Sequence, residues 1–126
     1  MKKSHKIIYW VATVWMCFGM TYAGIIQIMQ SPEETTMMQH LGYPNYLLPI
    51  LGSWKILGVI ALLMPKFPLV KEWAYAGFIF TVTGALASHI ISHDGFKEIV
   101  GPSLFIVLIT TSWYFRPADR RITSAT

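Results

Sequence analysis

Four long apolar segments constrain the fold of this chain more than any other feature. They cover about residues 7–29, 46–64, 72–92 and 99–115, and they contain almost no charged side chains. A helix needs about 20 mostly apolar residues to cross the hydrocarbon core of a bilayer, where every backbone polar group must find its hydrogen-bond partner inside the protein. The sequence therefore predicts an all-α fold: an integral membrane four-helix bundle, in a single domain over residues 1–126.

The composition fits a chain whose main partner is the lipid bilayer. Charged residues make up 13% of the sequence, whereas soluble domains carry about 25%. The net charge is +4, but the basic residues flank the apolar segments, so they indicate membrane topology and no nucleic-acid partner is expected. Cys17 is the single cysteine, which excludes an intrachain disulfide and Cys-x-x-Cys redox chemistry.

Basic residues are distributed unevenly among the segments that connect the apolar spans. If the N-terminus is cytoplasmic, Lys97 is the one basic residue on the far side, and Lys55 lies within the membrane. The others all fall on the cytoplasmic side: Lys2, Lys3, Lys6, Lys66, Lys71, Arg116, Arg120 and Arg121. Because lysine and arginine concentrate in cytoplasmic loops, this predicts that both termini are cytoplasmic (N-in/C-in). The connection 31–45, with a short helix over about 32–41, is then outside, and the tail 116–126 is interpreted as mobile.

Small residues recur at helical spacing in two of the spans. Gly52 and Gly58 lie three positions to either side of Lys55, which predicts that another backbone approaches this face closely. The third span carries a longer stripe: Ala74, Gly77, Thr81, Gly84 and Ser88. Small residues let membrane helices approach each other closely. This stripe is therefore predicted to be the strongest packing face in the chain.

Lys55 is the one charged residue near the middle of a predicted span. A lysine there costs at least about 2.5–3.5 kcal/mol, which makes it a candidate functional group. Counting residues from the ends of the other spans places Thr21, Tyr22 and Thr83 near the depth of Lys55 in the membrane. No acidic residue falls at that depth. Lys55 is then either a structural residue satisfied by hydroxyls and carbonyls, or the binding group for an anionic or carbonyl-bearing ligand such as a quinone. In the second case His89 is expected at the outer mouth of the same pocket.

The histidines near the end of the third span are candidate metal ligands. His89 and His93 are one helical turn apart, and Asp94 or His40 could join them. Histidine pairs that bind metal on a helix usually have a further ligand or a Glu within the motif. We therefore predict polar packing at the membrane surface and no metal site.

Familiar catalytic motifs are missing from the sequence. It contains no Gly-rich phosphate loop, no His-Glu-x-x-His and no Gly-x-Ser-x-Gly. No catalytic residues are predicted, and an enzyme that acts without partners is not expected.

Several longer sequence motifs resemble those of one family of membrane proteins. They are Leu41-Gly-Tyr-Pro-Asn-Tyr46, Leu51-Gly52…Lys55-Ile-Leu-Gly58, Lys71-Glu-Trp-Ala-Tyr-Ala-Gly-Phe78 and Gly84-Ala85…Ser88-His89. In this order and spacing they resemble the DoxX-like family of small bacterial membrane proteins. The resemblance extends from the first span to about Phe115. It implies a four-helix bundle in the bacterial cytoplasmic (inner) membrane, and a link to quinones, because the founding relatives are small subunits of a thiosulfate:quinone oxidoreductase.

Three functions remain open at this point. The first is an accessory subunit, or a binding module for a lipophilic, quinone-type ligand, in a membrane redox system. The alternative is a small four-span transporter, although small multidrug exporters use a membrane-embedded acid that the first span lacks. The third is a membrane redox enzyme. Each is compatible with partner subunits or with a homo-oligomer.

Overall fold

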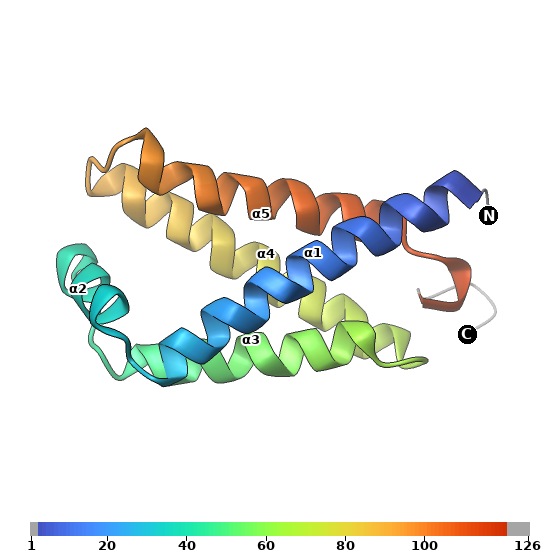
Figure 1. Ribbon diagram of the computed structural model, residues 1–126, viewed down its shortest axis with the longest axis horizontal. Coiled ribbons are helices and arrows are strands. Elements are labelled where there is room, and N and C mark those ends of the chain that lie inside the picture. Colours follow the sequence, from blue (N-terminus) through green and yellow to red (C-terminus); the bar gives the residue numbers. More distant parts are fainter. Residues whose placement is uncertain (1–2, 121–126) are drawn as a thin grey trace.

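The computed structural model describes residues 3–120 and is helical throughout (Figure 1). The elements are α1 (Lys3–Ile28), α2 (Pro32–Leu41), α3 (Leu47–Leu63), α4 (Pro68–Ile91), α5 (Phe96–Tyr114) and a short 3-10 helix, η1 (Ala118–Arg120). The predicted all-α fold is confirmed, and a helix covers most of each predicted span. Lys2 and Arg121, which entered the charge count, lie outside the described residues.

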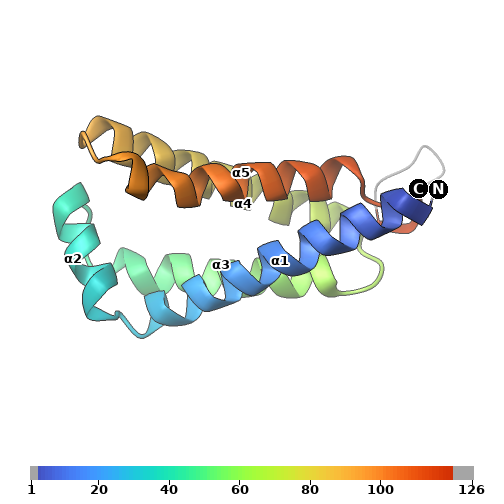
Figure 2. The same ribbon diagram turned by 45° about the horizontal axis from the view of Figure 1, so that its top comes forward.

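The four long helices form two pairs. α1 packs along α3, and α4 packs along α5; further contacts join α1 to α5 and α3 to α4. Figure 2 shows the two pairs as layers, with α2 across one end of the molecule. The start of α1 and the end of α5 both lie at the opposite end (Figure 1). Below, these are called the α2 end and the terminal end.

The short helix α2 begins and ends as its sequence predicts. Pro32 occupies the first turn, followed by Glu33 and Glu34, where a missing N–H costs nothing and negative charge is favoured by the helix dipole. Gly42 ends the helix with φ of 84°, a left-handed conformation that favours glycine.

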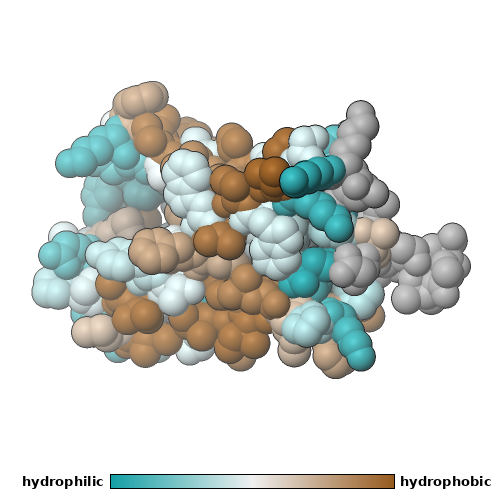
Figure 3. All heavy atoms as spheres, turned by 45° about the vertical axis from the view of Figure 1, so that its right-hand side comes forward, coloured by the Kyte–Doolittle hydropathy of each residue, from teal (hydrophilic) through white to brown (hydrophobic). Residues whose placement is uncertain are grey.

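The outer surface of the bundle is strongly apolar. Three described helices, α1, α4 and α5, are long and apolar enough to cross a membrane, while α3 is apolar but has 17 residues. Large side chains such as Phe18 and Phe80 are 76% and 74% exposed. Apolar side chains cover the middle of the visible face, and hydrophilic ones gather toward its two ends (Figure 3). Such a surface is unusual for a soluble monomer and matches lipid contact.

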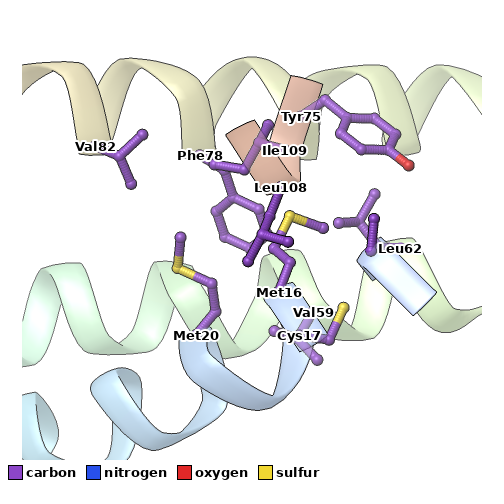
Figure 4. Packing of buried hydrophobic residues seen from close by; sticks show 11 residues of the cluster. Met16, Cys17, Met20, Val59, Leu62, Tyr75, Phe78, Val82, Leu108 and Ile109 are labelled. Atoms are coloured by element: carbon purple, nitrogen blue, oxygen red, sulfur yellow. The ribbon is translucent and has the colours of Figure 1, made fainter. Parts of the chain in front are cut away.

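The core lies between the two helix pairs, toward the terminal end. Met16, Leu62, Phe78 and Ile109 come from four different helices and are nearly inaccessible; Figure 4 shows them converging.

A buried polar cluster adds to this core. The Ser112 hydroxyl lies 2.6 Å from the Thr13 hydroxyl and 2.8 Å from the Tyr75 hydroxyl. Hydrogen bonds of this kind join membrane helices. They tie α1, α4 and α5 together at the terminal end.

Only part of the predicted small-residue packing is present. A Cβ added at Gly52 would lie 2.6 Å from the carbonyl oxygen of Gly24, so the backbones of α1 and α3 do approach closely there. A Cβ at Gly58 would meet the side chain of Phe78, and no backbone.

The prediction for the α4 stripe was wrong. Apart from chain neighbours and the backbone of the same helix, no described atom lies within 4 Å of a Cβ built at Gly77 or at Gly84. The buried face of α4 is formed by larger side chains: Lys71, Tyr75, Phe78, Val82 and His89. These bulky residues pack toward the core, and the small stripe lines open space between α3 and α4.

The structure also differs from the prediction for the start of the C-terminal tail. Arg120 is buried, and its guanidinium donates hydrogen bonds to the Tyr9 hydroxyl (2.9 Å) and the Leu62 carbonyl (2.7 Å). The predicted mobile tail is therefore anchored as far as Arg120. Its remainder, 121–126, lies outside the described residues.

Candidate ligand site around Lys55

A cavity of about 240 Å³ lies inside the bundle, between the helix pairs at the α2 end, and is open in part to the surface, where Phe80 in its wall is 74% exposed. Its walls come from α1 to α4 and are mostly apolar. They include Met37, Met38, Leu41, Leu47, Leu51, Phe80 and Ala85. The polar residues along the wall are Gln27, Tyr43, Lys55, Thr81, Ser88 and His89. An apolar cavity with a few converging polar groups is the usual form of a small-molecule site.

Lys55 is the only lysine on the cavity wall. It is half-buried, and its Nζ donates a hydrogen bond of 2.9 Å to Oε1 of Gln27 on α1. Among the residues that the structure describes, Lys55 forms no salt bridge. The ammonium carries three protons, so one amide oxygen satisfies only part of its donor capacity.

Glu34 on α2 is the acid whose charge acts on Lys55. One of its carboxylate oxygens, Oε2, is buried and has no hydrogen-bond partner in the described part of the chain. The two groups interact electrostatically and do not form an ion pair. No carboxylate oxygen among the described residues lies within 4.0 Å of the Lys55 ammonium.

A carboxylate held by two histidines ties α2 to the loop after α4. Asp94 Oδ1 lies 2.5 Å from Nε2 of His40, and Oδ2 lies 2.6 Å from Nδ1 of His89. A carboxylate can only accept hydrogen bonds, so both histidine nitrogens must carry the proton. Nearby, the hydroxyls of Tyr43 and Ser88 lie 2.6 Å apart. Together these contacts span the α2 end of the bundle beside the cavity; we call them the α2 latch.

The latch is arranged to keep Asp94 ionised. Hydrogen bonds from His89 and from His40 hold the pKa of the Asp94 carboxyl below its usual range. A carboxyl with a lowered pKa stabilises the folded state above its unfolded pKa of about 3.9, and this contribution is lost as the pH falls through the lower folded value. Lowering the pH from 7 to about 5 should therefore leave Asp94 ionised and able to hold both histidines.

Replacing Asp94 with alanine should open the cavity to water. Both histidine contacts of the latch are lost, so α2 is held by fewer contacts. A cysteine introduced at Ala85, on the cavity wall, should then react several-fold faster with a membrane-impermeant maleimide; the native Cys17 is buried. Glu98→Ala in the nearby first turn of α5 is the matched control. Equal labelling rates in the two variants would show that the latch does not close the cavity.

The structure brings together two of the five residues predicted from the sequence. Lys55 and His89 line the same cavity. Thr21 and Tyr22 line a separate groove on the outer side of α1, where Tyr22 is 64% exposed. Thr83 is exposed, and its hydroxyl donates to the Ile79 carbonyl of its own helix at 2.6 Å.

Sequence reasoning missed the direct partner of Lys55. Gln27 lies six residues beyond Thr21, toward the α2 end, and the long lysine side chain reaches up to it. An amide inside an otherwise apolar span was the available signal. Asp94 and His40 bind each other in the α2 latch, and within residues 3–120 no group of three His, Cys, Asp or Glu is arranged to hold a metal.

The fold and the site define a helical membrane protein with a lysine in an apolar internal cavity. The family model of the DoxX-like family matches residues 11–112. The chain therefore belongs to the DoxX-like family. No curated protein and no solved structure matches the chain.

Proposed function

We propose that this DoxX-like membrane protein binds a lipophilic ligand through a carbonyl or anionic oxygen, with a quinone as the best-fitting class, and that it serves a membrane redox system as an accessory module. The observation that carries this proposal is Lys55. It lies on the wall of an apolar cavity, with one hydrogen bond to Gln27 and no salt bridge among the described residues. A buried charge normally needs a partner, and a bound oxygen would supply one.

The size and polarity of the cavity suit a single ring. Its volume is about 240 Å³, and an apolar cavity of about 150 Å³ can already hold benzene. Lys55 would donate a hydrogen bond to one ring oxygen, and its positive charge would favour the reduced, anionic form of a quinone because it stabilises the negative charge that reduction creates. The protein thus provides a site at which such a ligand is bound and its potential adjusted.

The proposed setting is the bacterial cytoplasmic membrane, with α1, α3, α4 and α5 as four spans of one domain and both termini inside. The location of both ends of the bundle supports this, because an even number of spans returns the chain to the side on which it began. In this orientation the α2 end faces outward. In the Asp94→Ala variant, the maleimide added outside intact cells should then react with the cysteine introduced at Ala85. If it reacts only after the membrane has been opened, the orientation is the opposite one.

Replacing Lys55 with methionine tests the proposal. Methionine has a similar length and no charge, and a hydrogen bond to a charged group contributes about 1.5–3 kcal/mol. The amount of lipophilic compound extracted per purified protein, measured by mass spectrometry, should therefore fall about tenfold or more.

Lys97→Met is the matched control, because Lys97 is exposed at the start of α5 and lies outside the cavity. It should retain the same compound as the wild type. If the Lys55 variant and the wild type carry equal amounts, or if neither carries any, Lys55 is a structural residue and the proposal fails. A normal size-exclusion profile of the Lys55 variant would show that it has folded.

A further inference from the structure

We propose that the ligand enters the Lys55 cavity sideways from the bilayer, through the groove between α3 and α4, and that it is an amphiphile whose apolar chain stays in this groove while its oxygen-bearing head reaches Lys55. This inference rests on the function proposed above. It adds the class of ligand and the route by which the ligand arrives.

The groove between α3 and α4 has a volume of about 550 Å³ and is separate from the internal cavity. Its walls are mainly apolar and include Trp54, Leu57, Val70, Trp73 and Phe78. Trp54 and Trp73 are 63% and 65% exposed, on a surface that faces lipid in the proposed setting. The groove is therefore accessible from the bilayer.

Three residues line both the groove and the cavity: Leu51, Lys55 and Thr81. The side chain of Lys55 thus forms part of the boundary between the two spaces. A head group that approaches along the groove meets the lysine at this boundary. Movement of the flexible lysine side chain is enough to join the two spaces, because its four-carbon stem has several rotatable bonds.

The α2 latch makes the route from water the less accessible one. Hydrogen bonds join Asp94 to His40 and His89 across the α2 end, and beside them the hydroxyls of Tyr43 and Ser88 are hydrogen-bonded. Beside Gly77, on the α4 wall of the groove, there is open space: apart from its own helix backbone and chain neighbours, a Cβ added there would meet no atom within 4 Å. Hydrogen bonds thus span the α2 end of the cavity, whereas the groove between α3 and α4 opens on the surface that faces lipid in the proposed setting.

The shape and charge of the groove favour a single chain over a partner helix. A helix with its side chains is about 10–12 Å across, whereas α3 and α4 touch beside Lys55, where a Cβ at Gly58 would lie 2.6 Å from Phe78. A helix could cover the groove without reaching the lysine. A flexible chain with a polar head can follow the groove and place one oxygen at the Lys55 charge.

Two glycines on α4 allow the groove and the cavity to be tested separately. Gly77 lines only the groove and Gly84 lines only the cavity, and both have open space where a side chain would be. Leucine at either position should fill its space without disturbing the core. Ala76→Leu is the control, because Ala76 lines a different groove, between α4 and α5.

Two probes are used on the purified full-length protein in lipid nanodiscs: a benzoquinone with a decyl chain, and the same ring without the chain. Binding is followed by quenching of tryptophan fluorescence. Gly77→Leu displaces several methylene groups of the decyl chain from the groove, so it should raise the Kd of the decyl probe about tenfold or more. The Kd of the chainless ring should stay unchanged.

The other variants distinguish this inference from the function on which it rests. Gly84→Leu and Lys55→Met should weaken both probes, and Ala76→Leu should weaken neither. If Gly84→Leu and Lys55→Met weaken binding but Gly77→Leu does not, the lateral route is wrong and the binding function stands. If the wild type binds neither probe, or if none of the variants changes binding, both proposals fall.

Discussion

Replacing Gly52 with leucine is expected to lower the free energy of unfolding by about 3 kcal/mol or more, because overpacking of a tight contact typically costs 1–3 kcal/mol and rigid neighbours raise this cost. A Cβ at Gly52 would lie 2.6 Å from the carbonyl oxygen of Gly24 and 3.0 Å from the backbone nitrogen of Ile28. These are backbone atoms of α1, which cannot turn aside as a side chain can. The whole of α1 would have to move away from α3.

The measurement is reversible unfolding in mixed micelles, followed by tryptophan fluorescence. Gly77→Leu is the matched control, since it makes the same substitution in a neighbouring membrane helix at a site with open space. It should change the stability by less than about 1 kcal/mol. If both variants lose the same stability, the close contact between α1 and α3 does not contribute to the fold in the way the structure indicates.

The second large effect is expected at Arg120, whose replacement by methionine should lower the free energy of unfolding by about 3 kcal/mol, because it removes several hydrogen bonds that involve a buried charge. The guanidinium donates to the Tyr9 hydroxyl and to the carbonyls of Leu62 and Met64, the last at 3.3 Å. It also lies 4.9 Å from the ring centroid of Trp10.

The position of Arg120 explains why the loss should be large. The last carbonyls of a helix lack partners within the helix and carry partial negative charge. At the end of α3 two cations supply the missing donors: Arg120, and Lys71, which is 1% exposed and donates to the carbonyls of Ala61 (2.9 Å) and Met64. Removing Arg120 leaves the Leu62 carbonyl without this donor and releases η1 from Tyr9 on α1.

Arg116→Met is the control for this prediction. Arg116 pairs with Glu72, with Nε 2.7 Å from Oε1, but both side chains keep some exposure, 16% and 25%. A partly exposed ion pair contributes less than a buried guanidinium with several acceptors, so this variant should lose clearly less stability than Arg120→Met. Thermal unfolding of the two variants side by side would decide the matter; a stability loss at Arg116 that equals or exceeds the loss at Arg120 contradicts the anchoring role.

The two ends of the bundle differ in a way that bears on the proposed function. At the terminal end the helix pairs are joined by the core, by the cluster around Ser112 and by Arg120. At the α2 end they are separated by the cavity and connected mainly through the α2 latch. A firmly packed end and a hollow end suit a module that holds a ligand at one depth of the membrane.

Much of this architecture is readable from the sequence. The apolar segments predict the long helices, because only helices satisfy their backbone in lipid, and Pro32 and Gly42 mark the ends of α2. The sequence motifs between Leu41 and His89 resemble the DoxX-like family, and the model of that family matches residues 11–112 of the chain. Lys55 stands out because a charge in an apolar span is costly.

The sequence by itself thus determined that the chain is helical, which segments are apolar enough for lipid, and which residue is the exceptional charge. The tertiary structure alone decided which groups meet. Counting residues along a helix gives the depth of a side chain but not the direction in which it points, so Thr21, Tyr22 and Thr83 matched Lys55 in depth and face elsewhere, while Gln27 reaches it. For the same reason, the small residues of α4 form open space instead of a packed seam: the bulky face beside them determines how far away α3 lies.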